Sequence, residues 1–465
     1  MSQRDTNNIK KQEQKDCFVP RNDNQEVIEN GVKQSAHKKE IASARLLSTS
    51  QHELRNDVRV PKLRFKEFEG EWHKKKLNTK IDFIAGYAFK SKMMKNFESK
   101  YQLLKMSNIY KSELQLDRNP SYWEKIDDKL KKYLLKKKDI LLTLTGTVGK
   151  KDYGYSIVIP KNDRFLLNQR LVCLRAKTNI SDADFINNLI KTSKFYYSFF
   201  NESKGGTGNQ TNVGVDDLRN IKLLIPSFQE QQKIASFLAA VDTKIQQLTT
   251  KKELLENYKK GAMQQLFSQQ LRFKNDDGTD FPDWEEKRLG EVGKIITGKT
   301  PSTSDEKLWN GEIQFITPTD IQENIKFQTQ TKRTVVKNKR LNILPINSIV
   351  YTCIASIGKM CLTTKESITN QQINSIIPYQ KYNYEYVYYY LLFLTPKIKS
   401  TQANTTLPII NKTDFSKFKI KTPSLKEQQK IANYLSALDK KITNVALQIT
   451  NTQTFKKGLL QQLFV

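Results

Sequence analysis

The residues best suited to chemistry lie in short polar loops that directly follow strand-like runs. Residues 145–151 ("TGTVGKK") and 354–360 ("IASIGKM") match each other, with small residues that permit close backbone approach and then a lysine. Side chains of this kind can hydrogen-bond base edges or phosphates of a nucleic acid. The simpler alternative is a turn that only closes a sheet. The candidates are Thr145, Thr147, Lys150, Lys151, Ser356 and Lys359.

Three further pairs of polar stretches occupy matching places in the two halves of the chain. They are "GYAFKSK" (86–92) with "GKTPSTS" (298–304), "NQR" (168–170) with "NQQ" (370–372), and "GGTGNQTN" (205–212) with "QANTTLP" (402–408). They supply the same polar and basic side chains, and the same alternative applies to each. The added candidates are Lys90, Lys92, Gln169, Arg170, Asn209, Gln210, Lys299, Ser302, Gln371, Gln372, Asn404 and Thr405.

The sequence gives little support to catalytic chemistry. Residues 119–122 ("NPSY") lack an upstream glycine-rich cofactor loop, and residues 205–214 are glycine-rich without a following Gly-Lys-Ser/Thr. Three histidines and four widely spaced cysteines provide few metal ligands. We therefore predict a chain that is not an enzyme by itself, with no catalytic and no metal-binding residues.

Net charge is the strongest bulk signal. The chain carries 78 Lys and Arg against 48 Asp and Glu, a net +30, and residues 1–60 hold only +2 of it. A field of this size favours a polyanion such as double-stranded DNA, although a lysine-rich composition is the bland alternative. The lysine runs 74–76 and 136–138 could either contact phosphates or only face the solvent, and the sequence favours neither interpretation.

Composition also indicates where the protein acts. No apolar run reaches 18 residues, and the start "MSQRDTNNIKKQEQK" has no apolar core of a secretory signal. We expect a cytoplasmic protein that does not contact a membrane.

A long passage occurs twice. Residues 226–267 align without a gap to residues 423–464, and 20 of the 42 pairs are identical. Each copy opens with Pro-Ser, contains no further proline, and places apolar residues at steps of four and three, which is typical of a coiled-coil helix. Four residues interrupt this apolar seam toward its far end: Lys252 and Lys259 in the first copy, and Thr452 and Lys456 in the second. The candidate partner-docking and spacer residues are Glu230, Gln231, Ile234, Leu238, Val241, Ile245, Glu427, Gln428, Ile431, Leu435, Leu438 and Ile442.

The simplest partner for each helix is the other copy, in an antiparallel pair with internal two-fold pseudosymmetry. A helix of about 40 residues would span about 60 Å. The alternative is two unrelated helices that pair between chains, as in a homodimeric coiled-coil scaffold.

The regions between the helices carry short strand-like runs, polar turns and a few helices, a pattern typical of α+β domains with twisted sheets. Trp72 and Trp284 occupy matching places at the two domain starts. Residues 38–54 hold the one possible short helix of a polar, mobile extension. The predicted boundaries are extension 1–58, domain 59–225, helix 226–270, domain 271–422 and helix 423–465.

These features together resemble the specificity subunits of type I restriction–modification systems. The resemblance rests on "P-S-x-x-E-Q-Q-K-I-A-x-x-L-x-x-x-D" after each variable region, with "LRFKEFEGEW", "GYAFKS" and "GKTPS" at the domain starts. It covers about residues 60–465, and the extension at 1–58 departs from the usual pattern.

The resemblance implies two target-recognition domains, each reading one half of a bipartite DNA target, with the paired helices as spacer. It also implies two methyltransferase subunits docked through the helical regions and two restriction/translocase subunits. S-adenosylmethionine, ATP and Mg²⁺ would bind to those partners, and no cofactor to this chain.

Overall fold

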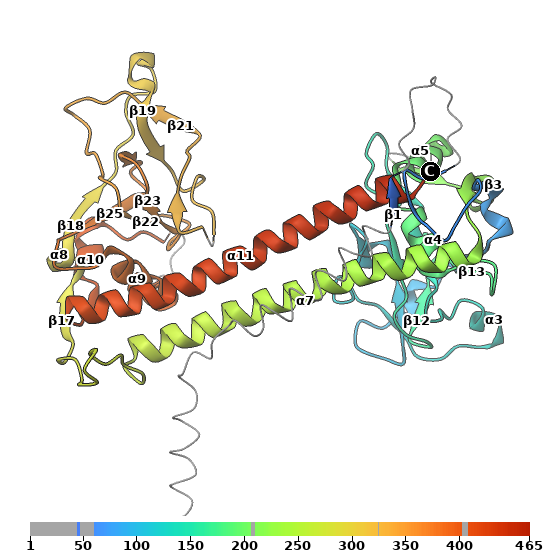
Figure 1. Cartoon of the computed structure of the whole chain (residues 1–465), viewed down its shortest axis with the longest axis horizontal. Coiled ribbons are helices and arrows are strands. Elements are labelled where there is room, and N and C mark those ends of the chain that lie inside the picture. The colour runs from blue at the N-terminus through green and yellow to red at the C-terminus, as the bar shows by residue number, and fades with distance from the viewer. Residues whose placement is uncertain (1–43, 47–59, 206–209, 324, 402–407) are drawn as a thin grey trace, which may run out of the picture. The chain divides into compact units, whose positions relative to one another are not determined.

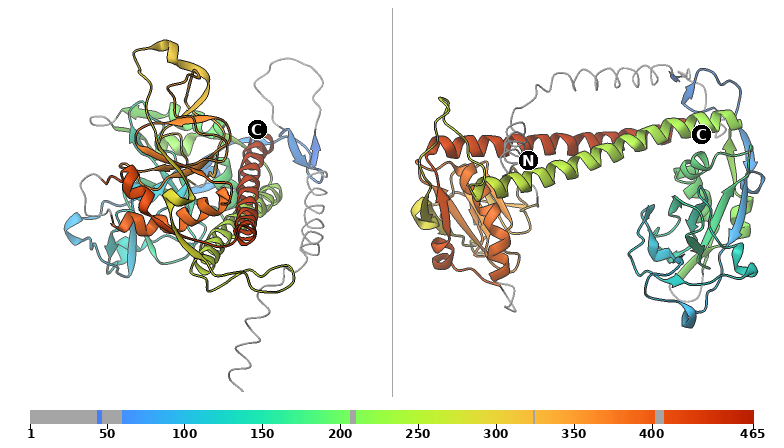
Figure 2. Two further views of the ribbon diagram at one scale, coloured as in Figure 1. Left: turned by 90° about the vertical axis from the view of Figure 1, so that its left-hand side faces the viewer. Right: turned by 90° about the horizontal axis from the view of Figure 1, so that it is seen from below.

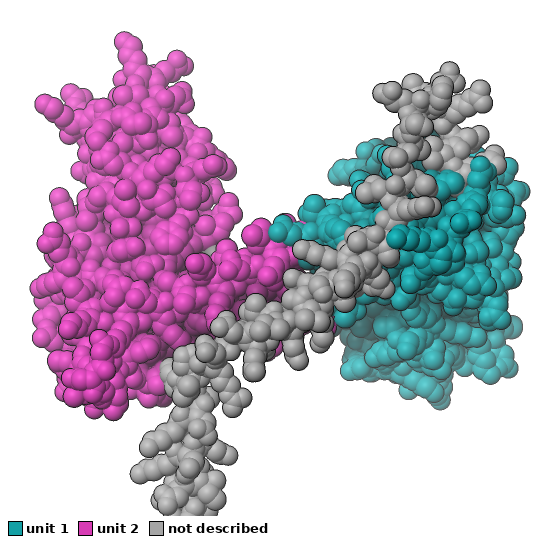
Figure 3. Space-filling view, viewed as in Figure 1, with its two compact units in different colours: residues 1–245, 451–465 teal, residues 246–450 magenta. Residues whose placement is uncertain are grey.

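The structure, a computed structural model, describes residues 44–46, 60–205, 210–323, 325–401 and 408–465. It divides into two compact units (Figure 3). Unit 1 comprises residues 1–245 and 451–465, and unit 2 comprises residues 246–450. Each unit has its own sheets and its own buried core, and each includes a segment of both long helices.

Unit 1 is centred on a four-stranded antiparallel sheet of order β11-β9-β13-β4. A mixed sheet β12-β5-β8, a ribbon β10-β15-β14 and the pairs β16-β3, β6-β7 and β1-β2 complete it. The strands are β1 (Ala44–Leu46), β2 (Leu63–Phe65), β3 (His73–Lys76), β4 (Ile81–Ala85), β5 (Tyr101–Leu104), β6 (Ile109–Tyr110), β7 (Glu113–Leu114), β8 (Tyr122–Trp123), β9 (Ile140–Thr143), β10 (Thr145–Thr147), β11 (Ser156–Val158), β12 (Phe165–Leu167), β13 (Leu171–Ala176), β14 (Ser203–Gly205), β15 (Gln210–Val213) and β16 (Lys222–Ile225). The α-helices between them are α3 (Asp128–Lys131), α4 (Ala183–Leu189), α5 (Ser193–Asn201) and α6 (Val215–Asn220).

Unit 2 repeats this plan around a five-stranded sheet of order β18-β25-β22-β23-β20. The sheet β21-β19-β24 and the pair β17-β26 accompany it. The strands are β17 (Glu285–Arg288), β18 (Gly293–Thr297), β19 (Trp309–Ile316), β20 (Phe327–Gln328), β21 (Arg333–Val335), β22 (Ile349–Thr352), β23 (Met360–Thr363), β24 (Ser367–Thr369), β25 (Ile373–Pro378) and β26 (Lys419–Thr422). The helices are α8 (Leu289–Val292), α9 (Tyr384–Thr401) and α10 (Lys412–Lys417).

The two repeated passages form the long helices α7 (Phe228–Phe267) and α11 (Leu425–Leu463). Both begin directly after a Pro-Ser pair. The hydroxyl of Ser227 accepts a hydrogen bond from the backbone N–H of Glu230 at 3.3 Å, and Ser424 does the same for Glu427 at 3.4 Å. A serine oxygen at this position satisfies one of the unpaired N–H groups of the first helical turn.

Within each unit, a segment of α7 lies antiparallel beside a segment of α11 (Figures 1 and 2). In unit 1, Ile234 and Leu238 share a core with Leu459 and Leu463. In unit 2, the end of α7 shares a core with Ile431, Leu435 and Leu438. Ile245 and Ile442 are half-buried. The predicted fold of two α+β domains with two long antiparallel helices is confirmed.

Two of the lysines that interrupt the apolar seam, Lys259 and Lys456, form ion pairs across the helices, whereas Lys252 pairs with Glu256 of its own helix. In unit 1, Lys456 Nζ lies 2.6 Å from Asp242 Oδ1, and in unit 2 Lys259 Nζ lies 2.5 Å from Asp439 Oδ1. These residues exchange places under the 197-residue offset of the repeat, so the two bonds are equivalent. The ion pair of each unit is therefore the repeat counterpart of the ion pair of the other.

The short helix expected within residues 38–54 is wrong where the structure describes this stretch. Ala44–Leu46 forms β1, paired antiparallel with β2. Strand β2, which lies outside this stretch, pairs with β1 in the sheet, and the local helix propensity of residues 38–54 does not reveal such pairing. The rest of residues 1–58 lies outside the described residues.

Candidate nucleic-acid interface

In unit 1, the central sheet brings three of the candidate loops to one edge. Strand β4 ends where β13 begins, with Ala85 opposite Val172, and β9 ends at the same level, with Thr143 opposite Leu171. Residues 86–92, 168–170 and 145–151 therefore leave the sheet at the same edge. The candidates Lys90, Lys92, Lys150, Lys151, Gln169 and Arg170 are all exposed there.

Gly86 fixes the first of these loops against the second. Its N–H donates to the backbone oxygen of Leu171 at 3.1 Å. A Cβ at Gly86 would lie only 1.9 Å from the backbone oxygen of Asn168, so a larger residue cannot be accommodated without moving the backbone. The glycine of "GYAFKS" thus sets the position of the neighbouring "NQR" turn.

The loop at 145–151 begins as a strand of the β10-β15-β14 ribbon. Thr145 lies opposite Asn212, and Thr147 lies opposite Gln210. The N–H of Thr147 donates to Asp152 at 2.8 Å and its hydroxyl at 2.7 Å. These two bonds lower the pKa of Asp152, so this carboxylate stays charged and holds the turn closed.

Unit 2 has the same edge. Thr297 at the end of β18 lies opposite Asn374, and Thr352 at the end of β22 lies opposite Ile373. Residues 298–304, 354–360 and 370–372 therefore leave one edge together. Gly298 repeats the role of Gly86, because a Cβ there would lie 2.2 Å from the backbone oxygen of Asn370.

The candidates of unit 2 differ in exposure. Lys299, Ser302, Ser356 and Gln371 are exposed, whereas Lys359 and Gln372 are half-buried. The hydroxyl of Thr300 donates to Gln371 Oε1 at 2.8 Å and ties the first loop to the third. Asn209, Asn404 and Thr405 lie outside the described residues.

Two features of the surface were not expected from the sequence. Asn212 is exposed on β15 next to Gln210, and alternation of exposed and buried residues in "QTNV" was its only signal. In unit 2 the indole of Trp309 donates to the backbone oxygen of Ser302 at 2.9 Å, and the Arg333 guanidinium lies 3.4 Å from its ring centroid. Trp309 therefore positions the loop that carries Ser302.

The lysine run 136–138 lies away from these loops. It precedes β9, so it lies at the opposite edge of the central sheet, and Lys138 forms an ion pair with Asp184. Lysines 74–76 are exposed and form most of β3, which pairs with β16.

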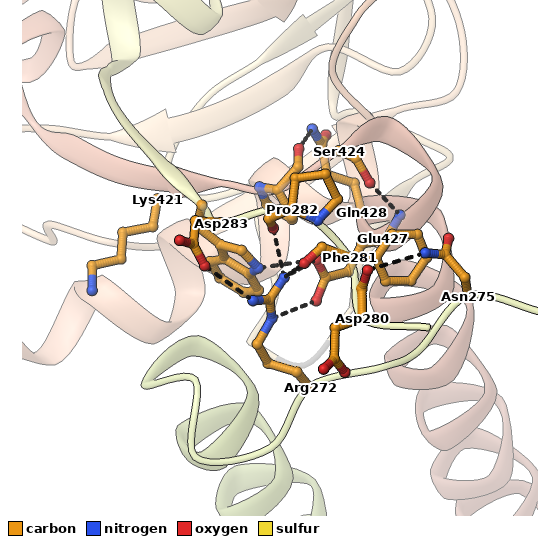
Figure 4. Close-up of polar contacts among 12 residues, drawn as sticks. Arg272, Asn275, Asp280, Phe281, Pro282, Asp283, Lys421, Ser424, Glu427 and Gln428 are labelled. Carbon is orange, nitrogen blue, oxygen red and sulfur yellow. Dashed lines mark hydrogen bonds and ion pairs between the residues drawn. The ribbon is translucent and has the colours of Figure 1, made fainter. Parts of the chain in front are cut away.

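A polar cluster of one arginine, one tryptophan and one buried glutamate, termed the clasp, joins each domain to the start of its long helix. In unit 2, the Arg272 guanidinium donates to both carboxylate oxygens of Glu427, at 3.2 and 2.9 Å (Figure 4). The indole N–H of Trp284 donates to the same carboxylate at 3.0 Å. Glu427 is fully buried, and its carboxylate raises the pKa of Arg272.

Unit 1 contains the same clasp. Arg64 donates to both oxygens of Glu230 at 2.8 Å, and Trp72 donates to it at 3.2 Å. The glutamines that follow are also used alike. Gln231 Oε1 accepts the N–H of Asp182 at 3.1 Å, and Gln428 Oε1 accepts the N–H of Asn383 at 2.9 Å. Glu230, Gln231, Glu427 and Gln428 are thus buried contacts within the chain rather than surface residues of the helices.

Apolar side chains remain on the outer surface of the helices. On α7, Leu254 is 64% and Tyr258 is 53% exposed, beside a shallow hollow lined by Gln246, Gln247, Thr250, Lys251 and Leu255. On α11, Leu447 and Phe455 are exposed, and Phe455 is the repeat counterpart of Tyr258. Exposed apolar side chains that lie side by side on a helix, as Leu254 and Tyr258 do, commonly mark a protein interaction surface.

Two other kinds of site are absent from the described ranges. No group of three or more His, Cys, Asp or Glu side chains in these ranges could hold a metal ion. No helix of the described residues is long and apolar enough to cross a membrane.

The fold and its loops define a class of protein in which one α+β unit and one helix are duplicated, with different polar loops at equivalent sheet edges. Comparison with known proteins names the family. The model of the type I restriction modification DNA specificity domain matches residues 69–257 and 282–452. The chain belongs to this family.

Individual relatives agree with this assignment. The specificity subunit of the type I restriction enzyme HindI from Haemophilus influenzae is 26% identical over 369 residues, 62% of this chain and 80% of that protein. The MjaIX specificity subunit from Methanocaldococcus jannaschii is 32% identical over 210 residues, 43% of this chain and 48% of that protein. The crystal structure of the S subunit from M. genitalium has the same fold, with a TM-score of 0.53 and 17% identity over 87% of this chain and 99% of that one.

Proposed function

We propose that this chain is the DNA specificity subunit of a type I restriction–modification complex. Each unit reads one half of a bipartite DNA target, and the paired helices set the spacing between the halves. The observation that carries the proposal is the duplicated sheet edge. The same backbone frame presents Thr145, Gln169 and Arg170 in unit 1 but Ile354, Gln371 and Gln372 in unit 2. The same backbone arrangement with different side chains in the two units suits the recognition of two half-sites of different sequence.

Charge supports DNA as the ligand. The exposed lysines and Arg170 at the edge of unit 1 can neutralise phosphates, which supplies affinity, while the amide and hydroxyl side chains beside them can contact bases. Family membership supports the same choice.

The proposal assigns the chemistry to other subunits. Two methyltransferase subunits would bind S-adenosylmethionine, and two restriction/translocase subunits would use ATP and Mg²⁺, whereas this chain would recognise DNA without catalysis. The adjacent exposed side chains Leu254 and Tyr258 on α7 form a surface proposed to dock a partner subunit, and Leu447 and Phe455 on α11 are separate exposed apolar positions proposed for the same role. The helix seam itself is filled by contacts within the chain, which argues against a homodimeric coiled coil.

The test is co-expression of the chain with its methyltransferase partner, followed by sequencing of methylated adenines. We expect a motif of two unlike parts separated by a fixed number of unspecified bases. A continuous or palindromic motif, or no methylation that depends on this chain, would overturn the proposal. Mass measurement of the purified complex distinguishes it from a homodimer of this chain.

A further inference from the structure

We infer that the β10-β15 ribbon of unit 1 reads an adenine in the major groove, with Asn212 as the specificity-determining residue and Gln210 beside it. This inference rests on the proposed function and names the base chemistry of one half-site. The Asn212 and Gln210 side chains would contact the DNA directly, whereas the clasps only hold each domain on its helix.

The two faces of the ribbon have different characters. Gln210 and Asn212 are exposed, while Thr211 and Val213, which alternate with them, are buried. Because directly opposed residues of an antiparallel pair lie on the same face, Thr145 and Thr147 share the outer face with these two amides. The outer face therefore presents two amides and two hydroxyls.

The inner face is fixed by Gly146. A Cβ at this position would lie 2.2 Å from the Tyr153 ring and 2.6 Å from Asp152, so only glycine lets the strand approach Tyr153 this closely. Tyr153 in turn packs against Phe199 and Phe200. The ribbon is thus seated on a rigid aromatic support, which suits a reading element whose side chains must hold their geometry.

Both threonine hydroxyls of this outer face donate hydrogen bonds to other side chains of unit 1. The Thr145 hydroxyl donates to Asn212 Oδ1 at 3.1 Å, and the Thr147 hydroxyl donates to Asp152. The bond from Thr145 orients the Asn212 amide. Its oxygen keeps a second lone pair, and no side chain that the structure describes accepts from its Nδ2, which leaves both Nδ2 hydrogens for a ligand.

This donor–acceptor pair selects one base. Adenine presents the N7 acceptor beside the N6 donor in the major groove, which an Asn or Gln amide matches with two hydrogen bonds. Guanine presents two acceptors and is matched by arginine or lysine instead. Asn212 lies on the middle strand of the three-stranded β10-β15-β14 sheet, and strands of a sheet can read the major groove. Lys150 and Lys151, which follow β10, are exposed for contact with the adjacent phosphates.

The equivalent position of unit 2 has no such pair. The Val213 N–H donates to the Leu144 oxygen in unit 1, as the Ile410 N–H does to the Cys353 oxygen in unit 2. Thr145 and Asn212 therefore correspond to Ile354 and Ile409, which form a bridge. Two isoleucines cannot hydrogen-bond a base edge, so amide reading at this position belongs to unit 1.

The experiment uses the complex of this chain with its methyltransferase subunits and selection from a pool of randomised DNA duplexes. With the wild-type chain, one half-motif should contain a strongly preferred adenine. Asn212→Ala should abolish the preference at that position alone, and Asn212→Asp, which keeps the shape but lacks the N–H donors, should do the same. Lys137→Ala at the opposite sheet edge should leave the motif unchanged.

A chemical probe completes the test. Replacing the preferred adenine by 7-deazaadenine removes the N7 acceptor, so it should weaken binding by the wild-type complex about 5- to 150-fold and have little effect on the Asn212→Ala complex. A bipartite wild-type motif that neither variant alters would overturn the inference and leave the proposed function standing. A wild-type complex that selects no bipartite motif would overturn both.

Discussion

Removal of the Arg272 side chain should destabilise the junction between the second domain and helix α11 far more than removal of the nearby Lys274 side chain. Arg272 holds the buried carboxylate of Glu427 with two hydrogen bonds and also donates to the backbone oxygens of Phe281 and Pro282, at 3.1 and 2.7 Å. In Arg272→Ala the carboxylate would keep the Trp284 indole as a donor but lose its opposite charge.

The magnitude follows from burial. The Glu427 side chain is 0% exposed and that of Arg272 is 23% exposed. Breaking a buried ion pair by removing one partner costs about 3–5 kcal/mol, since a charge stays buried without compensation. Because Trp284 remains and Arg272 is partly exposed, we expect the lower end of this range. Lys274→Ala is the matched control, since its ion pair with Asp280 is 3.6 Å long and exposed, and such pairs contribute less than about 1 kcal/mol.

The assay is hydrogen exchange of the full chain, read by mass spectrometry over residues 271–288 and 423–435. A loss of about 3 kcal/mol corresponds to roughly 100-fold faster exchange of amides that open with the junction. The double variant Arg272→Met with Glu427→Leu should recover most of the protection, because no charge is left buried. Equal exchange in Arg272→Ala and Lys274→Ala, or a double variant as unstable as the single one, would refute the reasoning.

Three further predictions concern stability, each measured by urea unfolding. Burial and the nearby charge of Lys456 lower the pKa of Lys191 to about 8, so unit 1 should gain stability as pH rises from 8 to 10.5, where only the unfolded chain still holds the proton; Lys191→Met should abolish this gain. Gly86→Ala should destabilise unit 1 by about 1–3 kcal/mol through its clash with the backbone of Asn168, and an unchanged unfolding midpoint would contradict that packing. Gly261→Ala, in open space on α7, should stabilise by about 0.5–1 kcal/mol, whereas a loss would indicate an unrecognised contact.

The sequence predicted the architecture because its main signals are local and repeated. The apolar period of the two helices and the matched domain starts require no knowledge of distant contacts. The interruptions at Lys259 and Lys456 were visible as breaks, but their ion pairs became evident only when the antiparallel register placed Asp439 and Asp242 opposite them.

The candidate site was predictable in its loops and less so in its side chains. Matching of short stretches between the two halves of the chain found the loops that meet at one edge of each central sheet. It missed Asn212, because an exposed asparagine on a short strand looks like any polar turn residue. It also grouped Glu230 and Glu427 with the partner-docking and spacer residues and did not reveal that both are buried. Their burial depends on Arg64 and Arg272, which lie more than 150 residues away.

The measurement that tests the central claim most directly is a methylation map after exchange of one reading unit. Residues 77–221 would be replaced by those of another family member, which keeps the Arg64 clasp and the β3–β16 pair of this chain. With the partner methyltransferase unchanged, the account predicts a motif in which one half is new while the other half and the spacing are retained. A motif changed in both halves, or in neither, would contradict the claim that each unit reads its own half of the target.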